Sequence, residues 1–278
     1  MTVSQRILIT GAAGAVATLL RPRLARPGRV LRLLDVRETP DPAMDGAEEV
    51  MVGSVTDLPA MIEACRDVAA VVHLGGQSGE ASLEEVLQVN VYGSYCALEA
   101  ARQAGVGRVV LASSNHAVGF HDRRDGLPPG GLPAGAPPRP DTYYGWSKAA
   151  AEAAGQLFAD RFGMDVLCLR IGSWFPAPPG LRGLATWLSP DDGARLVEAC
   201  LAAERPGFRI VWGISRNTRR WWSLAEGEAI GYVPVDDAEQ YAPALIAEHG
   251  EPDFDADPQL ARIGGPWCET PLGTSPPG

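Results

Sequence analysis

The sequence is poor in cysteine and in basic residues, and it has no long apolar run. Its five cysteines are odd in number and form no C-x-x-C pair, so neither a disulfide framework nor a zinc ribbon is expected, and a reducing cytoplasm is favoured. No segment is long and apolar enough to cross a bilayer. The net charge is −10, from 24 Lys and Arg against 34 Asp and Glu, without a basic block. This balance argues against nucleic acid and anionic membranes as partners.

Short apolar runs alternate with helical segments along the chain. The runs are apolar nearly throughout, which is typical of strands buried on both faces of a parallel sheet. This alternation predicts an α/β protein with a doubly wound parallel sheet of about seven strands, a Rossmann fold. The expected strands are Arg6–Thr10, Val30–Leu34, Glu49–Val52, Ala70–Leu74, Arg108–Ala112, Asp165–Arg170 and Phe208–Trp212. The expected helices are Ala15–Ala25, Asp57–Ala64, Leu83–Ala104, Tyr143–Phe162 and Pro190–Ala203.

Residues 1–278 are expected to form a single Rossmann-type domain. Residues 122–138 are rich in Gly and Pro, which predicts a surface loop or a lid. The regular pattern ends after Trp212, so any substrate-binding portion must come from residues 173–189 and 213–270 and would be a small C-terminal lobe. The pair Trp221-Trp222 is expected in the core or at an oligomer contact.

A glycine-containing turn joins the first predicted strand to the first predicted helix. Gly11 allows a positive φ, and Gly14 lets the backbone approach a pyrophosphate that binds helix N–H groups. Asp35 ends the second strand 24 residues after Gly11, where a carboxylate can accept both ribose hydroxyls. A carboxylate there repels a 2′-phosphate, so NAD is favoured over NADP, although Arg37 leaves NADP open. A plain strand-end turn is the alternative interpretation of Asp35.

A tyrosine and a lysine stand four residues apart at the start of a predicted helix, on one helix face. These are Tyr144 and Lys148. A phenol with an ordinary pKa of about 10 is a poor base near neutrality, and a neighbouring ammonium lowers that pKa. Ser114 follows the fifth predicted strand, at the sheet edge where ligands of such folds bind. Its hydroxyl can hold a substrate oxygen while Tyr144 removes the proton.

Together these motifs resemble the extended short-chain dehydrogenases/reductases, and more specifically the bacterial uronate dehydrogenases. The likeness extends from residue 6 to about Tyr232. The more specific motifs are His73–Ser78, Ser113–Gly119, Arg170–Ser173 and Ala185–Asp192.

The resemblance implies oxidation of D-glucuronate or D-galacturonate at C1 with NAD⁺, giving an aldarolactone, in a protein that is a homo-oligomer. Matching positions imply that Tyr144 is the base, that Lys148 modulates it and that Ser114 holds the reacting oxygen. The implied sugar-acid ligands are Ser78, Ser113, Asn115, His116, Ser173 and, for the carboxylate, Arg182. The implied cofactor residues are Gly11, Ala13, Gly14, Ala15, Val16, Asp35, Leu74, Gly75, Gly76, Asn90, Lys148 and Ile171.

Several alternatives stay open at this point. Arg182 could be a solvated loop residue, with Arg216, Arg219 or Arg220 as the anion ligand instead. Ser54 stands where relatives commonly carry an Asp that binds adenine, so that contact is expected to be weaker. No metal is expected, because two loop histidines without a third ligand make a poor site. A nucleotide-sugar epimerase or dehydratase, which needs a roomier C-terminal lobe, and a non-catalytic NAD sensor are the alternative functions.

Overall fold

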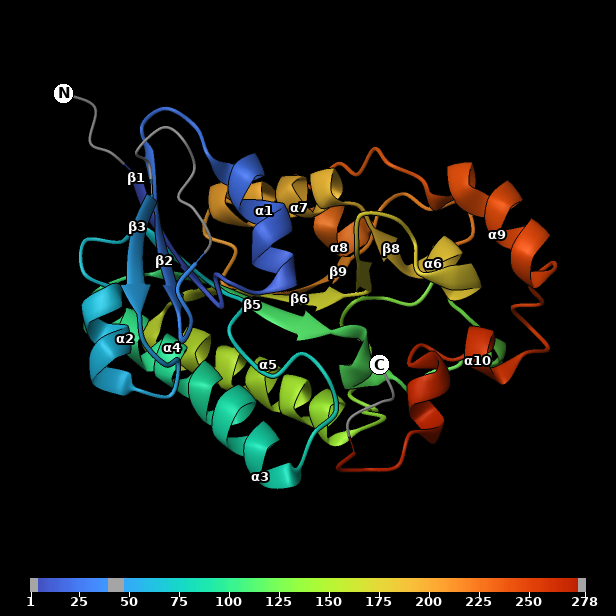
Figure 1. Ribbon diagram of the computed structural model, residues 1–278, viewed down its shortest axis with the longest axis horizontal. Coiled ribbons are helices and arrows are strands. Elements are labelled where there is room, and N and C mark those ends of the chain that lie inside the picture. The colour runs from blue at the N-terminus through green and yellow to red at the C-terminus, as the bar shows by residue number, and fades with distance from the viewer. Residues whose placement is uncertain (1–4, 40–47, 275–278) are drawn as a thin grey trace.

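The computed structural model describes residues 5–39 and 48–274, and its centre is a seven-stranded parallel sheet (Figure 1). The strand order is β3-β2-β1-β4-β5-β6-β9, and every neighbouring pair is parallel. The doubly wound α/β fold and all seven expected strands are thereby confirmed. The strands are β1 Gln5–Thr10, β2 Arg29–Asp35, β3 Glu48–Val52, β4 Ala70–His73, β5 Arg108–Ser114, β6 Asp165–Ile171 and β9 Phe208–Gly213.

Helices cover both faces of the sheet, because the continuous apolar strands expose apolar side chains on each face. In β1, Ile7 and Ile9 point into one buried cluster and Leu8 into the other. Figure 1 shows α1 and α7 on one face and α2, α4 and α5 on the opposite face. These helices are α1 Ala15–Leu24, α2 Leu58–Ala64, α4 Gly93–Gln103, α5 Tyr143–Phe162 and α7 Pro190–Ala202.

The expected helix Leu83–Ala104 is helical along nearly its whole length but is not uniform. It consists of α3 Leu83–Val86, a π-helical segment Leu87–Tyr92, and α4. Asn90 lies within the π-helical segment and is buried. π-Helical turns often occur at functional sites, and this one brings a buried polar side chain toward the edge of the sheet.

The C-terminal portion packs as a small lobe beside the sheet. Its strands β7 Ser173–Trp174 and β8 Trp187–Leu188 form a second, two-stranded sheet. A hydrophobic cluster that includes Leu184, Trp187, Ala238 and Ala242 joins α6 to the segment after β9. The helices of this portion are α6 Gly180–Thr186, α8 Ala225–Glu228, α9 Ala242–His249 and α10 Pro258–Ala261. Its assignment to substrate binding stays a prediction.

The Gly/Pro-rich segment 122–138 lacks regular structure apart from one 3-10 turn and isolated bridges, as expected, but three of its residues are buried. Leu132, Ala134 and Ala136 are buried. Arg170 donates hydrogen bonds to the carbonyls of Ala134 and Ala136, at 2.7 and 2.8 Å. Pro133 and Gly135 between them are exposed, so the segment is a surface loop as predicted, except that a buried guanidinium holds its backbone at Ala134 and Ala136. The lid interpretation stays a prediction.

The Trp221-Trp222 pair belongs to the core. Both indoles are buried, and Trp222 stacks on Trp212 with ring centroids 4.4 Å apart. The Trp212 indole N–H also donates to the Leu132 carbonyl, at 3.0 Å. The oligomer-contact interpretation of the pair is therefore wrong.

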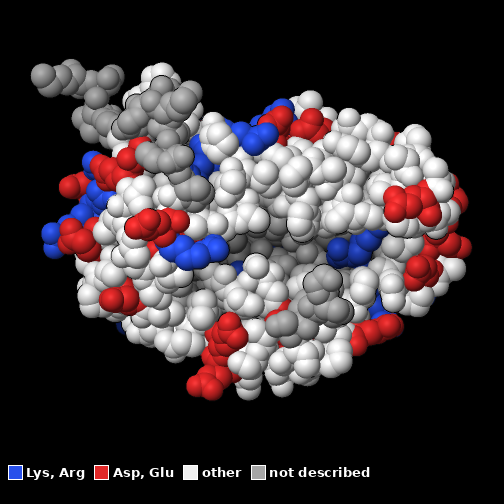
Figure 2. Space-filling view, viewed as in Figure 1, with Lys and Arg blue, Asp and Glu red and all other residues white. Residues whose placement is uncertain are grey.

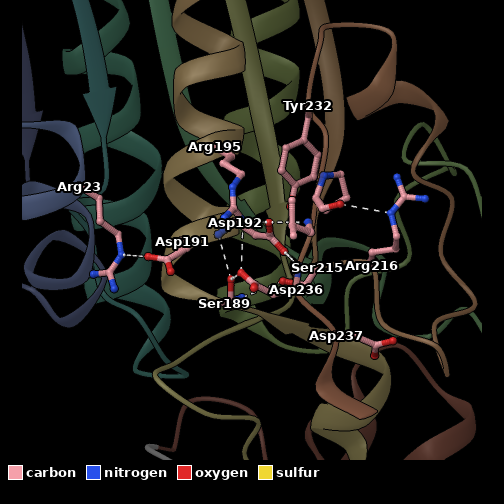
Figure 3. Close-up of polar contacts among 12 residues, drawn as sticks. Arg23, Ser189, Asp191, Asp192, Arg195, Ser215, Arg216, Tyr232, Asp236 and Asp237 are labelled. Carbon is pink, nitrogen blue, oxygen red and sulfur yellow. Dashed lines mark hydrogen bonds and ion pairs between the residues drawn. The ribbon is translucent and has the colours of Figure 1, made fainter. Parts of the chain in front are cut away.

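The Ser189–Asp192 motif fixes the start of α7 to the lobe (Figure 3). The Ser189 hydroxyl caps the helix by accepting from the Asp192 N–H at 2.9 Å, and it donates to Asp236 at 2.5 Å. The fully buried Asp192 carboxylate accepts from the N–H groups of Val235 and Asp236 and pairs with Arg195. This specific sequence motif therefore stabilises the lobe.

We predict that Arg170→Met lowers the free energy of unfolding by about 3–5 kcal/mol, because it leaves the buried Glu152 carboxylate without its cation. The two side chains form a bidentate pair at 2.7 and 2.8 Å and are nearly inaccessible. Urea unfolding at neutral pH measures the loss. The matched control is Arg66→Met, which breaks the exposed pair with Glu63 and should cost less than about 1 kcal/mol. Equal losses in the two variants would contradict the prediction.

Candidate active site

A crevice opens where β1 and β4 lie side by side, the point at which the strand order reverses and ligands of such folds bind. Gly11 has φ +68°, and a Cβ there would lie 2.7 Å from the Gly75 backbone, so only glycine fits. The crevice encloses about 550 Å³. Eight of the twelve predicted cofactor residues line it, namely Gly11, Gly14, Ala15, Val16, Asp35, Leu74, Gly75 and Gly76.

The crevice is lined by backbone N–H groups at the start of α1 and by the Asp35 carboxylate at the end of β2. Gly14 is the N-cap of α1, and no side chain caps this helix, so its first turn faces the crevice with backbone N–H groups. Asp35 accepts from the N–H groups of Ala13 and Arg37, both at 3.0 Å. The exposed Arg37 guanidinium lies 3.7 Å from Asp35 and donates to the Ala13 carbonyl. These residues fit a dinucleotide with an unphosphorylated ribose.

Asn90 and Ser54 bond to the protein at the rim of the crevice. The Asn90 amide accepts from the Gln77 N–H at 2.7 Å and donates to the Gln77 carbonyl and to Ser147. Ser54 lines the crevice, and its hydroxyl bonds to Thr56 at 2.8 Å. Asn90 thus joins the loop after β4 to α5, while its contact with the cofactor and the effect of Ser54 on adenine stay predictions.

A second cavity, of about 280 Å³, adjoins the crevice. Tyr144 and Lys148 reach it from α5, and Ser114 reaches it from the end of β5. The Lys148 ammonium donates to the Ala112 carbonyl at 2.8 Å and lies 5.4 Å from the centre of the Tyr144 ring. Ser78, Ser113 and Ile171 also line this cavity. The structure therefore brings the three predicted catalytic residues together beside the cofactor crevice.

Burial dominates the titration of the two predicted catalytic groups on α5, Tyr144 and Lys148. It raises the pKa of Tyr144 to about 12, against the opposing effect of a hydrogen bond with Ser114. It lowers the pKa of Lys148 to about 8. In the chain itself, desolvation of the phenolate outweighs its favourable contacts, and the effect of Lys148 on the Tyr144 pKa stays a prediction.

The pKa of Lys148 makes stability depend on pH in a defined direction. Between about 8, its pKa in the fold, and 10.5, its ordinary pKa, the unfolded chain binds more protons, so stability rises with pH. We predict that wild-type stability rises relative to Lys148→Met across this window and that the difference is constant below it. Urea unfolding over a pH series measures the difference.

Lys148 is the only lysine in the sequence, so its titration can be observed directly. Protein labelled with [¹³C]lysine should give one side-chain resonance with a midpoint near pH 8, set by burial. Unfolded protein in urea is the control and should titrate near 10.5. A folded midpoint at the unfolded value would contradict the predicted burial effect.

Asn115 and His116 contact the C-terminal segment, at Ile263 and Trp267 respectively. The Asn115 amide donates to the Ile263 carbonyl at 3.0 Å. The His116 ring stacks on Trp267, with centroids 4.1 Å apart, and meets the edge of Tyr144 at 5.9 Å. These two residues therefore lie next to the Tyr144 phenol, the predicted base.

Two predicted sugar ligands have hydroxyls that are already bonded within the protein. Ser113 donates to Glu152 at 2.6 Å, and Ser173 bonds to Thr186 at 2.9 Å. Ser173 lines a third cavity together with Arg182 and not the cavity of Tyr144. Substrate contacts of both serines stay predictions.

Arg182 lies on α6 and lines the third cavity, of about 460 Å³, with Trp267. Its guanidinium donates to the Ile263 carbonyl, and its Nε is buried without a hydrogen-bond partner. Within residues 5–39 and 48–274 no carboxylate lies within 4.0 Å of it. Burial lowers the pKa of Arg182 to about 10. The solvated-loop interpretation is therefore wrong, because the side chain is half-buried on a helix.

The three alternative arginines bond to other parts of the protein. Arg216 pairs with Glu228, and Arg219 pairs with Glu239 and Glu251. Arg220 donates to the Asn217 carbonyl. None of the three lines the cavities that contain Tyr144 or Arg182.

Sequence reasoning missed three residues that shape the site. The fully buried Glu80 accepts from the N–H groups of Tyr144 and Gly273, at 2.8 and 2.9 Å. Asp141 bonds to His116 and precedes α5, and Trp267 covers both His116 and Tyr144. These partners are up to 193 residues apart, so no local motif indicates them.

Figure 2 shows a hollow across the middle of the molecular face drawn there, with basic side chains at both ends and acidic ones around the outer rim.

In the described part of the chain, no cluster of three His, Cys, Asp or Glu side chains could hold a metal ion. His121, one of the two loop histidines expected from the sequence to make a poor metal site, bonds to the Pro137 carbonyl. The same described residues include no helix that could span a membrane.

The crevice and the Tyr144–Lys148 pair define a dinucleotide-dependent oxidoreductase. Residues 7–186 match the model of the NAD dependent epimerase/dehydratase family, and the chain belongs to this family. It is 40% identical to a uronate dehydrogenase of Pseudomonas putida over 96% of this chain and 97% of that protein. It is 35% identical to an NAD-dependent glucose-6-phosphate dehydrogenase of Haloferax volcanii, over 86% of this chain and 96% of that protein.

A solved structure of a tyrosine-to-alanine variant of the Agrobacterium tumefaciens uronate dehydrogenase, complexed with NAD, has the same fold. It is 36% identical, covers 96% of this chain and 98% of that chain, and superposes with a TM-score of 0.87. The chain is thus a homologue of uronate dehydrogenases and an NAD-dependent dehydrogenase. The predicted family and the predicted cofactor, NAD, are confirmed.

Proposed function

We propose that the protein oxidises a hexuronate, D-galacturonate or D-glucuronate, at C1 to the aldarolactone. The observation that carries this proposal is Arg182, a half-buried guanidinium without an ion pair in the described part of the chain, near the cavity of the catalytic phenol. Trp267 lines the Arg182 cavity and lies 5.8 Å from the Tyr144 ring, so the two regions adjoin. The near full-length likeness to named uronate dehydrogenases supports the same substrate class.

The residues of α5 and β5 would handle the proton of the anomeric hydroxyl. Ser114 donates to the sugar oxygen and orients it, and Tyr144 takes its proton. When bound, NAD supplies the acceptor for the hydride that leaves C1. Because burial raises the pKa of Tyr144, the phenolate depends on the positive charge of Lys148, so the lysine must be protonated. The product is a lactone because C1 belongs to a closed ring.

Arg182 would provide the carboxylate site. With a net charge of −10 the protein repels an anionic sugar at long range, so binding requires a local cation. A guanidinium matches a carboxylate with two parallel hydrogen bonds, and its buried Nε is one donor without a partner.

The H. volcanii relative favours a second candidate, oxidation of another sugar at C1 such as a sugar phosphate. The same arginine could bind a phosphate. A nucleotide-sugar epimerase is less well supported, because it needs a roomier C-terminal lobe, and a hydrophobic cluster around Leu184 and Trp187 occupies part of the small lobe here.

We predict NADH formation with galacturonate or glucuronate but not with UDP-glucose. Tyr144→Phe should lower kcat by about 10²–10⁴-fold, because the general base is lost. Arg182→Ala should raise KM for the uronate by about 10–100-fold with little change in NAD⁺ affinity, because charge-assisted hydrogen bonds to the carboxylate are lost.

Arg216→Ala is the matched control and should leave KM unchanged, because that side chain pairs with Glu228 at the surface. Glucose 6-phosphate belongs in the same assay. Turnover of the phosphate without turnover of either uronate would replace the proposed substrate class. Undiminished activity in Tyr144→Phe would contradict the mechanism.

A homo-oligomer is also proposed, in the reducing cytoplasm that the free cysteines fit. The exposed Tyr95 on α4 and the exposed Phe162 on α5 both pack against the buried Phe158. Leu157 on the same helix is 59% exposed. Such a patch is typical of an interface.

We predict that light scattering gives the wild type a mass that is a multiple of the chain's own. Leu157→Glu should shift it toward the monomer, because a charge would be buried in the interface. Val233→Glu changes an equally exposed side chain elsewhere and is the control. A monomeric wild type would contradict the proposal.

A further inference from the structure

Asp141 lies in the loop before α5, and its carboxylate packs against three glycines that leave no room for a side chain of their own. The Asp141 side chain is fully buried. A Cβ added at Gly119 or Gly264 would lie 2.0 or 1.9 Å from its Oδ2, and one at Gly145 would lie 2.9 Å from its Oδ1. These glycines belong to three segments that are distant in the sequence. The Asp141 carboxylate therefore occupies a space that exists only because all three neighbours are glycines.

Asp141 has only a few donors. Its Oδ2 lies 2.6 Å from Nδ1 of His116, and its Oδ1 accepts from the Thr142 hydroxyl at 2.9 Å. A carboxylate oxygen accepts hydrogen bonds, so a proton on Nδ1 of His116 would satisfy this contact. Such a dyad would fix the proton on one side of the ring.

The protonation of Nε2, the second ring nitrogen of His116, follows from the position of the first proton. Burial and the nearby Arg182 lower the pKa of His116, while Asp141 and Glu80 oppose this shift, and the net direction is downward. A neutral ring has a single N–H, and with that proton on Nδ1 the Nε2 atom is an acceptor.

The ring is held with Nε2 available to a ligand. Trp267 stacks on one side of the ring and Tyr144 meets its edge. Within the described residues Nε2 has no hydrogen bond, and it is not among the buried atoms that lack a partner. About a tenth of the side chain stays accessible.

We propose that Asp141 is a positioning residue that holds His116 in the Nδ1–H tautomer, so that Nε2 accepts a hydrogen bond from a hydroxyl of the sugar. This inference rests on the proposed function. An acceptor at Nε2 repels the carboxylate of the substrate, whereas Arg182 attracts it. The two side chains thereby set the direction in which a sugar acid lies in the site.

The first test observes the tautomer without any substrate. In ¹⁵N-histidine protein, the His116 signals, assigned with His116→Gln, should show a protonated Nδ1 and an unprotonated Nε2. Asp141→Asn should reverse this pattern, because its amide can donate to Nδ1. Asp192→Asn makes the same change at another fully buried carboxylate and should leave the His116 signals as they are. A wild type protonated at Nε2, or an unchanged pattern in Asp141→Asn, would overturn the proposal.

The second test uses uronates in which fluorine replaces one ring hydroxyl, since fluorine cannot donate. Asp141→Asn should lower kcat/KM for the unmodified uronate by about 10–100-fold, mainly through KM, with NAD⁺ affinity retained. One fluorinated sugar should slow the wild type by a similar factor and affect Asp141→Asn little, because both changes remove the same bond. Fully additive effects for every fluorinated sugar would overturn the hydroxyl assignment. If the wild type oxidises no uronate, the proposed function fails, and the nitrogen spectra alone decide the role of Asp141.

Discussion

The position of α5 depends on three buried carboxylates, each of which must find donors inside the protein. Glu80 accepts from the N–H groups at the start of the helix, Asp141 lies immediately before it, and Glu152 lies on it and pairs with Arg170. An unpaired charge in the interior costs several kcal/mol, so each carboxylate ties a distant segment to α5. Tyr144 and Lys148 are positioned by these contacts as much as by the helix that carries them.

Burial has two opposing effects in this site: it disfavours the charged forms of the Tyr144 and Lys148 side chains, and it strengthens the interactions of the charges that remain. It raises the pKa of the phenol and lowers that of the ammonium, which by itself disfavours the ion pair that the proposed base catalysis needs. It also strengthens every remaining charge–dipole contact, because the surroundings are less polarisable than water. A cation without a carboxylate partner, such as Arg182 among the described residues, is then a strong local attraction for an anion in an otherwise acidic protein.

Most of the fold was predictable because its signals are local. Continuous apolar runs between helical segments indicate buried parallel strands, and the ends of such strands meet at one edge, so Gly11, Asp35 and Ser114 could be expected near one another. The spacing of Tyr144 and Lys148 determines their common helix face in the same way. The Gly/Pro-rich segment shows where this reasoning ends. Its composition predicts irregular backbone, but the buried Ala134 and Ala136 are held by Arg170, 36 residues away from Ala134.

The parts that could not be predicted all involve contacts across the chain. Glu80 and Trp267 stand in no recognisable motif, and their importance comes from Tyr144 and His116, which fold against them. The pKa of Tyr144 is a further case, since spacing indicates a nearby ammonium but not how much water the fold removes from the phenol. Residue types and local spacing therefore identify the groups that carry the chemistry. The protonation states of those groups are set by their surroundings, because only the assembled fold determines burial and the donors that remain.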